Sequence, residues 1–212
     1  MNEKSAETVV FIAATGNRHK VAEIAAFMRF FGIEILSKDE AGVADFEIAE
    51  TGATFEENAY IKADAVLACA GKPVIADDSG LMVDALKGAP GVHSARFSES
   101  GTDEDNNAKL LALLKDVPEG KRTAKFVSVI TILYPDGTAI VARGECAGRI
   151  LREPKGANGF GYDPLFVPLA HDRESRTFAE LSMEEKNAIS HRAKALAALR
   201  EKLIEAGYHG KK

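Results

Sequence analysis

Two adjacent acids, Asp77 and Asp78, follow the short apolar run at residues 74–76 and open an expected loop over residues 77–80. Carboxylates that follow a buried strand are costly unless water, a cation or hydrogen-bond donors surround them. Mg2+ suits such acids, because it binds one or two carboxylates together with phosphate oxygens and water. We therefore interpret Asp78, with Glu50 from a long loop, as a candidate magnesium site. A solvated acidic turn is the alternative.

A second candidate is the run of six residues in which an apolar strand gives way to a helix. The run consists of Thr15, Gly16, Asn17, Arg18, His19 and Lys20. Free backbone N–H groups and the helix dipole favour an anion at such a position, and phosphate is the natural ligand. The run matches neither the P-loop nor the dinucleotide-binding pattern, so a plain turn capped by Asn17 is the alternative. Phosphate together with the acids predicts a bridging metal, and hence phosphoryl or nucleotidyl chemistry.

Asn58 and Lys62 are four residues apart in a predicted helix and therefore share one face. From that face both side chains can reach a polyphosphate. The alternative is a surface pair that Lys62 forms with Asn58 or Glu57.

Two further groups suit the binding of a nucleotide base. The glycine-rich loop over residues 152–163 carries Phe160, Gly161, Tyr162 and Asp163. Its aromatic faces can stack on a base and its carboxylate can accept ring N–H hydrogens, whereas a buried aromatic turn is the alternative. The last predicted helix carries Lys186, His191 and Arg192, donors that can read a keto oxygen or brace phosphate. A solvated basic helix face is the alternative there.

Alternating strands and helices must position these groups. The patterns predict strands at residues 9–14, 33–36, 74–76, 123–134, 138–146 and 165–167. Apolar spacing and capping residues predict helices at residues 21–31, 54–70, 102–114 and 182–206. The early alternation and the late hairpin indicate a mixed α/β fold rather than a purely doubly wound sheet.

The composition is that of one globular domain with a substantial core, since 46% of the 212 residues are apolar and 28% are charged. A net charge of −5 argues against a nucleic-acid polymer as partner. Cys69 and Cys146 match no metal-ligand or redox spacing, so we interpret them as buried or semi-buried thiols. The first ten residues lack an apolar run, and no later stretch is long enough to span a bilayer. We therefore expect a cytoplasmic protein without a membrane partner.

Taken in order, six blocks resemble the inosine triphosphate pyrophosphatase family, also called dITP/XTP pyrophosphatases. The blocks are Thr15-Gly16-Asn17 with Lys20; Thr51-Gly52 with Phe55, Asn58 and Lys62; Ala76-Asp77-Asp78-Ser79-Gly80-Leu81; Gly88-Ala89-Pro90-Gly91 with Ser94-Ala95-Arg96; Gly159-Phe160-Gly161-Tyr162-Asp163-Pro164; and Glu185-Lys186 with Ile189-Ser190-His191-Arg192. Chance does not order six such blocks, and the resemblance extends from about residue 9 to residue 199.

The resemblance implies a mixed, elongated central sheet flanked by helices. It implies a single two-lobed domain over residues 1–212, with an active-site cleft between the lobes and flexible tails at residues 1–8 and 208–212. It also implies a homodimer that hydrolyses ITP, dITP and XTP to the nucleoside monophosphate and pyrophosphate with Mg2+ as cofactor.

The resemblance also assigns roles to individual residues. Asp78 would be the proton acceptor and a metal ligand, and Glu50 would join it at the metal. Substrate would be contacted by Thr15, Gly16, Asn17, Arg18, His19, Lys20, Lys62, Ser79, Phe160, Gly161, Tyr162, Asp163, Lys186, His191 and Arg192. Two features depart from the family pattern: Arg18 and His19 lie between motif positions, and Ala49 stands where many relatives have an acid.

Our hypothesis is that Asp78 orients or deprotonates a water that attacks the α-phosphorus and releases pyrophosphate. Donors that face the 6-keto oxygen would select the base. A Maf-type pyrophosphatase, acting on modified pyrimidine or methylated nucleotides, is one alternative. A regulator that binds a purine nucleotide without cutting it is another. The acids Glu50, Asp77 and Asp78 argue against the regulator, because a pure binder gains little from acids beside a phosphate loop.

Overall fold

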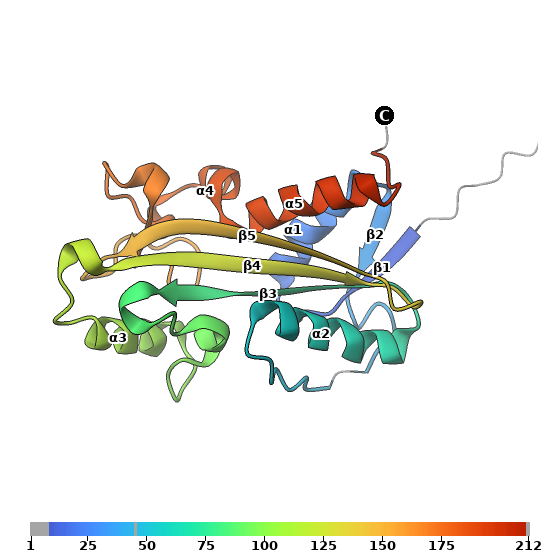
Figure 1. The fold of residues 1–212 in the computed structure, drawn as a ribbon, viewed down its shortest axis with the longest axis horizontal. Coiled ribbons are helices and arrows are strands. Elements are labelled where there is room, and N and C mark those ends of the chain that lie inside the picture. Colours follow the sequence, from blue (N-terminus) through green and yellow to red (C-terminus); the bar gives the residue numbers. More distant parts are fainter. Residues whose placement is uncertain (1–8, 45, 211–212) are drawn as a thin grey trace, which may run out of the picture. The chain divides into compact units, whose positions relative to one another are not determined.

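The computed structural model describes residues 9–44 and 46–210, and Figure 1 shows the order of their helices and strands. The strands are β1 (Val9–Ala13), β2 (Ile33–Leu36), β3 (Val74–Val83), β4 (Thr123–Leu133), β5 (Ala139–Ile150) and β6 (Phe166–Pro168). The helices are α1 (Arg18–Arg29), α2 (Phe55–Ala70), α3 (Asp103–Leu113), α4 (Met183–Ile189) and α5 (His191–Glu205). Short 3-10 turns, η1 to η5, lie between them, and η2 (Gly91–Arg96) precedes α3.

The strands form one mixed sheet in the order β2-β1-β3-β4-β5-β6. Strand β1 is parallel to both β2 and β3, with Val9 opposite Ile33 and Ile12 opposite Val74. Strands β5 and β6 are antiparallel. Because parallel and antiparallel pairs occur in one sheet flanked by helices, the predicted mixed α/β class is confirmed.

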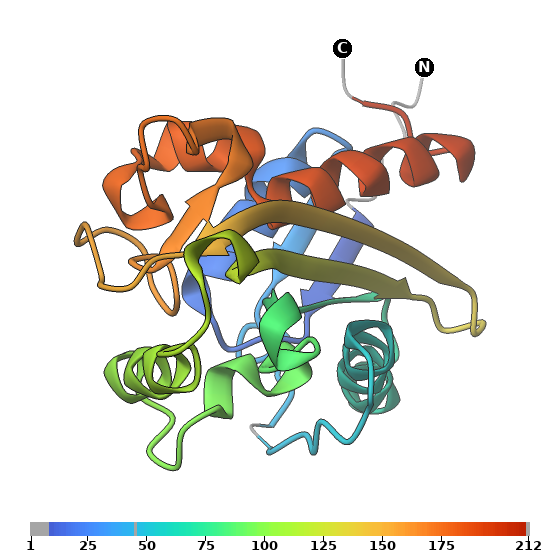
Figure 2. The ribbon, with the colours of Figure 1, turned by 60° about the vertical axis from the view of Figure 1, so that its left-hand side comes forward.

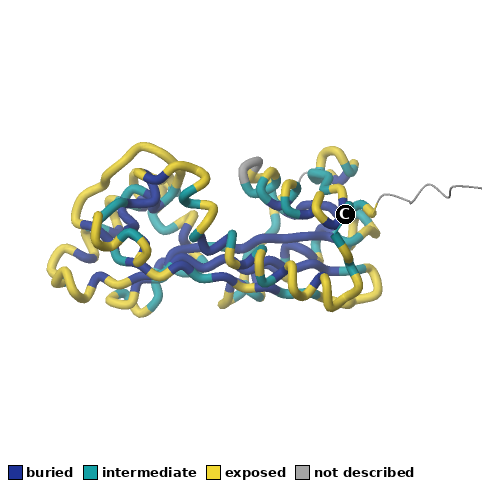
Figure 3. Tube along the Cα trace, turned by 90° about the horizontal axis from the view of Figure 1, so that it is seen from above, coloured by how far each residue is buried: buried dark blue, intermediate teal, exposed yellow. Residues whose placement is uncertain are grey.

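The chain divides into two compact units. The first unit comprises Met1–Asp77, Ile130–Ala142 and Leu196–Lys212, and the second comprises Asp78–Val129 and Arg143–Ala195. Each has its own apolar core: Ile12, Val66, Val74 and Leu133 belong to the first, and Leu81, Leu110, Phe126, Phe166 and Phe178 to the second. Figure 3 shows long buried segments in dark blue and exposed loops in yellow.

Strand β3 corrects one expectation. The sequence predicts a short strand that ends at residue 76 and a loop over residues 77–80, but β3 continues without interruption to Val83. The side chain of Asp77 is fully buried and Asp78 is 6% exposed, so the alternative of a solvated acidic turn is wrong. The apolar residues after Gly80 explain the difference: Leu81 and Val83 are fully buried, and their burial extends the strand through the polar segment.

The C-terminal helix is also different from the prediction. Residues 182–206 form two helices, α4 and α5, because Ser190 has extended backbone angles (φ −65°, ψ 158°) and ends α4. The predicted capping box is present, since Ser182 accepts a hydrogen bond from the backbone of Glu185. Lys186 therefore belongs to α4, whereas His191 and Arg192 begin α5.

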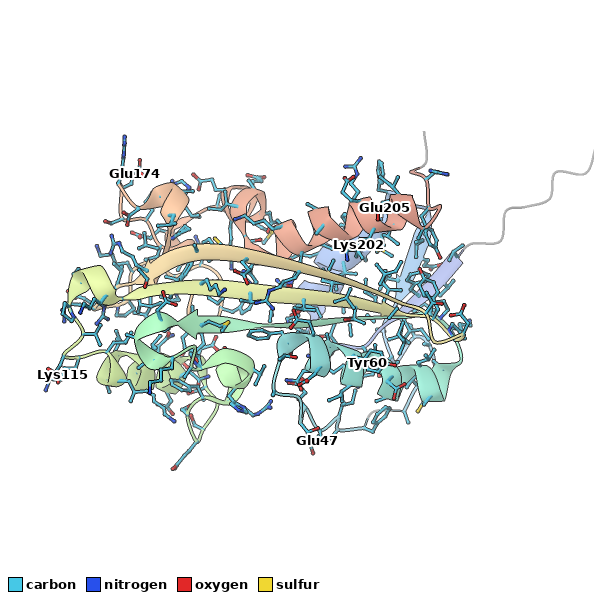
Figure 4. All side chains as sticks on the ribbon, viewed as in Figure 1. Glu47, Tyr60, Lys115, Glu174, Lys202 and Glu205 are labelled. Carbon is cyan, nitrogen blue, oxygen red and sulfur yellow. The ribbon has the colours of Figure 1, made fainter. Side chains whose placement is uncertain are left out.

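Helix α2 follows the sequence closely. Thr54 and Glu57 form the predicted capping box, and Gly71 ends the helix in the left-handed conformation (φ 61°). Near its start, Tyr60 is 44% exposed and is labelled in Figure 4. Tyr60 lines an apolar pocket of about 410 Å³ within the first unit, together with Gly52, Glu56, Glu57, Ile61 and Val141.

Several smaller expectations can be compared with the structure. Both cysteines are free, but Cys69 is exposed rather than semi-buried, whereas burial raises the pKa of the Cys146 thiol to about 11. Residues 1–8 and 211–212 of the predicted tails lie outside the described residues, and within the described part Tyr208 packs edge-on against Phe11. In the described part of the chain, the helices are all too short or too polar to cross a membrane.

Arg122 is the largest fully buried side chain of the second unit, and its guanidinium donates to three main-chain carbonyls. Nε donates to Ile150 O at 2.9 Å, Nη1 to Leu114 O at 2.6 Å and Nη2 to Leu151 O at 2.7 Å. Burial lowers the pKa of this guanidinium. One buried side chain thus connects the end of α3 to the end of β5.

We predict that Arg122→Met lowers the free energy of unfolding by about 3 kcal/mol, because buried carbonyls lose their donors. Arg152→Met is the matched control: its guanidinium also donates to two carbonyls, Lys115 O and Val117 O, but its side chain is 52% exposed. The control should change the free energy by less than about 0.5 kcal/mol. Urea unfolding followed by circular dichroism measures both, and equal losses would contradict the role given to Arg122.

Candidate active site

The run from Thr15 to Lys20 lies, as predicted, between the end of β1 and the first turn of α1. The backbone N–H of Ala14 donates to Ile75 O at 2.8 Å and fixes the start of this run. The side chain of Asn17 accepts a hydrogen bond from the backbone of Lys20 at 3.2 Å, so Asn17 caps the helix. The first turn of α1 contains no acid, which leaves its N-terminal N–H groups suited to an anion. The side chains of Arg18 and His19 lie outside the described residues, and their roles stay predictions.

An ion pair joins Lys20 to Asp77 inside the first unit. The side chain of Asp77 is fully buried and that of Lys20 is 15% exposed. A carboxylate buried within a strand needs a compensating cation, and Lys20 supplies it. The same pair holds the ammonium group of Lys20, which has three N–H donors, beside the predicted phosphate loop.

A second ion pair joins Lys62 of α2 to Glu50, with 3.2 Å between Nζ and Oε1. Lys62 is 9% exposed, so the alternative of a surface pair with Asn58 or Glu57 is wrong. One turn earlier, the fully buried Asn58 accepts a hydrogen bond from the backbone N–H of Gly52 at 2.8 Å. Asn58 and Lys62 therefore attach the segment from Glu50 to Gly52 to one face of α2.

Gly52 has little space around its Cα. A Cβ added there would lie 2.6 Å from Glu57 Cβ and 2.7 Å from Asn58 Oδ1. The block of Thr51, Gly52, Asn58 and Lys62 in the sequence thus has a physical reason, because the glycine lets the segment that carries Glu50 approach the start of α2.

In the second unit, Asp163 organises the predicted base-binding loop. Its Oδ2 accepts a hydrogen bond from the backbone of Phe160 at 3.0 Å and pairs with the ammonium group of Lys186. Burial raises the pKa of Asp163, although Lys186 opposes the shift. The Lys186 ammonium lies 4.9 Å from the ring centroid of Phe160, which is 44% exposed. An exposed aromatic ring beside an ammonium group that a carboxylate keeps in place can stack on a purine.

Tyr162 and Gly161 have different environments from Phe160. The Tyr162 side chain is buried, its hydroxyl donates to Ser94 O at 2.8 Å, and burial raises its pKa. Gly161 has a φ of 61° and lies between the exposed ring and the buried one. The alternative of a buried aromatic turn therefore describes Tyr162 but not Phe160.

The start of α5 is buried rather than solvated, so the alternative of a solvated basic face is wrong for His191 and Arg192, which are 7% and 4% exposed. The His191 ring stacks on Phe126 with 4.9 Å between centroids and an interplanar angle of 14°. Arg192 Nη2 lies 3.4 Å from Ser79 Oγ, which brings two predicted substrate-binding residues together. Gly144 of β5 faces this helix start, and a Cβ there would overlap the backbone of His191 and Ala195.

The chemistry of the predicted metal ligands fits magnesium, because Asp78 and Glu50 both offer carboxylate oxygens. Asp78 is nearly buried within β3, and Glu50 is compensated by Lys62. Within residues 9–44 and 46–210, no group of three or more His, Cys, Asp or Glu side chains is arranged to hold a metal ion.

Two residues that the sequence analysis missed contact the aromatic loop. Asp103 and Asn107 of α3 bind the backbone of Gly161 from opposite sides of the residue. Their spacing of four residues on a helix is the signal in the sequence, since it gives both side chains one face. That signal has no value without the tertiary structure, because Asp103 and Asn107 are 58 and 54 residues before Gly161 in the sequence.

Comparison with known proteins gives the family. Residues 11–202 match the family model of the Ham1 family. The chain belongs to the Ham1 family. A protein from Desulforamulus reducens named dITP/XTP pyrophosphatase is 52% identical over 201 residues, which cover 93% of this chain and 97% of that protein. One from Symbiobacterium thermophilum with the same name is 48% identical, over 91% of this chain and 93% of the relative.

Solved Ham1 structures have the same fold. A Ham1 protein from Coxiella burnetii superposes with a TM-score of 0.84 at 41% identity, over 93% of this chain and 99% of the other. A structure titled nucleoside-triphosphatase / dITP/XTP pyrophosphatase, from Mycobacterium abscessus, gives a TM-score of 0.77 at 47% identity over 90% and 98% of the two chains. The resemblance read from the sequence is confirmed.

The contact between Gly52 and α2 leads to a prediction. Gly52→Ala should lower the free energy of unfolding by about 1 to 3 kcal/mol, because the added methyl group collides with Glu57 and Asn58. Gly120→Ala is the control, since no atom lies within 4 Å of a Cβ built at Gly120. Thermal and urea unfolding of the two variants provide the measurement, and a Gly52→Ala variant as stable as the control would refute the close approach.

Proposed function

We propose that the chain hydrolyses deaminated purine nucleoside triphosphates, namely ITP, dITP and XTP, to the nucleoside monophosphate and pyrophosphate. The names of the similar proteins support the substrate class. One observation carries the chemical side of the proposal: in the first unit, Asp77 pairs with Lys20, which lies in the acid-free first turn of α1. In the same unit, Glu50 pairs with Lys62. Cations and a helix N-terminus suit phosphate, whereas acids beside them suit a cation that accompanies phosphate.

In this proposal, the first unit binds the triphosphate. The backbone of Thr15 to Lys20 and the ammonium groups of Lys20 and Lys62 would donate to phosphate oxygens. The second unit would bind the base, with Phe160 stacking on the purine and Lys186, His191 and Arg192 supplying donors. Tyr162, Asp163 and Ser79 would support these contacts.

Asp78 would orient the attacking water and accept its proton on a carboxylate oxygen. The water oxygen forms a bond to the α-phosphorus, the bond from the α-phosphorus to the bridging oxygen breaks, and pyrophosphate leaves. Asp78 and Glu50 would be the residues that hold Mg2+, and the ion would neutralise charge on the phosphate oxygens. No covalent intermediate is required.

Selectivity against ATP would follow from unpaired donors. A 6-keto oxygen accepts hydrogen bonds from buried donors, whereas the 6-amino group of adenine leaves them unpaired at roughly 1 to 3 kcal/mol each. Guanine keeps the 6-keto oxygen, so rejection of GTP requires an unfavourable contact with its 2-amino group.

We also propose, from the family resemblance, that the protein acts as a homodimer in the cytoplasm, where the nucleotide pool is found. Size-exclusion chromatography with light scattering tests the dimer directly, and a monomer at micromolar concentration would overturn it.

The product assay tests the proposed function first. With Mg2+, ITP and XTP should yield pyrophosphate far faster than GTP, ATP or dTTP. ATP lacks the 6-keto oxygen, GTP carries the 2-amino group that the proposal requires to be disfavoured, and dTTP has no purine. Separate detection of pyrophosphate and orthophosphate identifies the bond that is cut. Orthophosphate as the product would exclude attack at the α-phosphorus, and turnover of modified pyrimidine nucleotides instead would favour the Maf-type activity.

The role of Asp78 generates a separate prediction. Asp78→Asn should lower kcat for ITP by roughly 100-fold to 10,000-fold, since the proton acceptor is lost while the side chain keeps its size. Binding of a non-hydrolysable ITP analogue, measured by calorimetry, should be retained. Asp116→Asn, at an exposed position on the same unit, is the control and should leave kcat unchanged. Undiminished turnover of Asp78→Asn would rule out Asp78 as the base.

A further inference from the structure

Both peptide groups that flank Gly161 are hydrogen-bonded to helix α3. The backbone N–H of Gly161 donates to Asp103 Oδ2 at 2.6 Å, and Asn107 Nδ2 donates to Gly161 O at 2.9 Å. These two bonds fix the orientation of the peptide planes on both sides of Gly161. Phe160 precedes Gly161, so both α3 and Asp163 hold the backbone that carries its ring.

The loop needs such support because its own backbone is permissive. Gly159 and Gly161 both have positive φ, at 79° and 61°, and glycine has more conformational freedom than any other residue. The side chain of Phe160 is 44% exposed, so packing alone does not hold it. Contacts to fixed groups must therefore define the position of the ring.

Helix α3 is a rigid support. Leu110 and Leu114 are fully buried in the core of the second unit. Asn106, on the same helix, accepts a hydrogen bond from Ser98 N at 2.7 Å and donates to Ala95 O at 3.3 Å, which attaches α3 to the segment around η2. Figure 2 shows α3 and η2 side by side. A loop bound to this helix inherits its fixed position.

The amide of Asn107 is not optimised for stability. Asn107 Oδ1 is buried, and among the described residues it accepts no hydrogen bond. A buried acceptor without a donor costs free energy, whereas an apolar residue at this position would avoid that cost. The same amide donates from Nδ2 to Gly161 O, so its hydrogen bond goes to the loop.

We infer that Asp103 and Asn107 are positioning residues for substrate selection: they hold the peptide of Gly161 so that Phe160 is in place to stack on the purine base. This inference rests on the proposed function. Neither residue touches the reacting atoms, so the pair acts on binding of the base rather than on cleavage.

Steady-state kinetics with ITP test the inference. Asp103→Ala and Asn107→Ala should each raise KM roughly fivefold to tenfold, about the effect of one lost hydrogen bond, and should change kcat less than about twofold. Glu104→Ala is the matched control, because it removes a charge from the same first turn of α3 at an exposed position. Asp103→Asn keeps an acceptor for Gly161 N and should restore KM to near the wild-type value. Unchanged KM in both alanine variants would overturn the inference.

A second measurement does not depend on turnover. The chain contains no tryptophan, so Phe160→Trp places a single tryptophan in the loop, which can be excited without exciting the tyrosines. In this background, Asp103→Ala should shorten the rotational correlation time of the indole, whereas Glu104→Ala should not, and circular dichroism verifies that all variants are folded. Equal anisotropy decays would overturn the inference. If the wild-type protein released no pyrophosphate from ITP, the proposed function would fail, whereas the anisotropy would still decide whether α3 holds the loop.

Discussion

The candidate site depends on the compensation of its buried carboxylate charge. Asp77 lies fully buried within β3, and a carboxylate in that position is stable only with a cation beside it. Lys20 provides the cation, and because Lys20 sits in the first turn of α1, the pair also fixes the helix start against the strand. Lys62 of α2 likewise pairs with Glu50, whose side chain is 25% exposed. The first unit therefore gains positive and negative groups together, which suits a ligand that is itself an anion accompanied by a cation.

In the second unit, polar contacts fix the position of an exposed aromatic ring, that of Phe160. Phe160 contributes little to any core, so its position depends on neighbours that are themselves fixed. Asp163 binds its backbone from inside the loop, Lys186 lies over its ring, and α3 holds the following residue. Each of these three supports is attached to the buried core by a different element. Polar contacts of modest individual strength can hold a ring in this way because they act on successive backbone groups.

Much of this arrangement is predictable from the sequence. Apolar periodicity and capping residues identified α2, α3 and the hairpin of β4 and β5, since those signals are local. Local signals do not predict the structure at Asp77 to Gly80, because these polar residues belong to β3, which continues to the apolar residues after Gly80. Nor do they predict the break at Ser190, where a single residue divides the last helix in two. The partners of Lys20 and Lys62 could not be read from spacing, because ion pairs between distant segments depend on strand order and loop path. For the same reason the sequence does not reveal Asp103 and Asn107, whose contact with the loop depends on the tertiary structure.

Gly144 also limits how the second unit can change. Because a methyl group at this position would overlap the backbone of His191 and Ala195, the first turn of α5 rests on β5 with main chain against main chain. Side chains can adopt other rotamers and so absorb a displacement, but two backbones in contact cannot. The contact at Gly144 therefore prevents α5 from moving closer to β5. The positions of His191 and Arg192 are therefore set by the backbone of β5. Substitutions along the outer face of α5 can accumulate without moving these two residues.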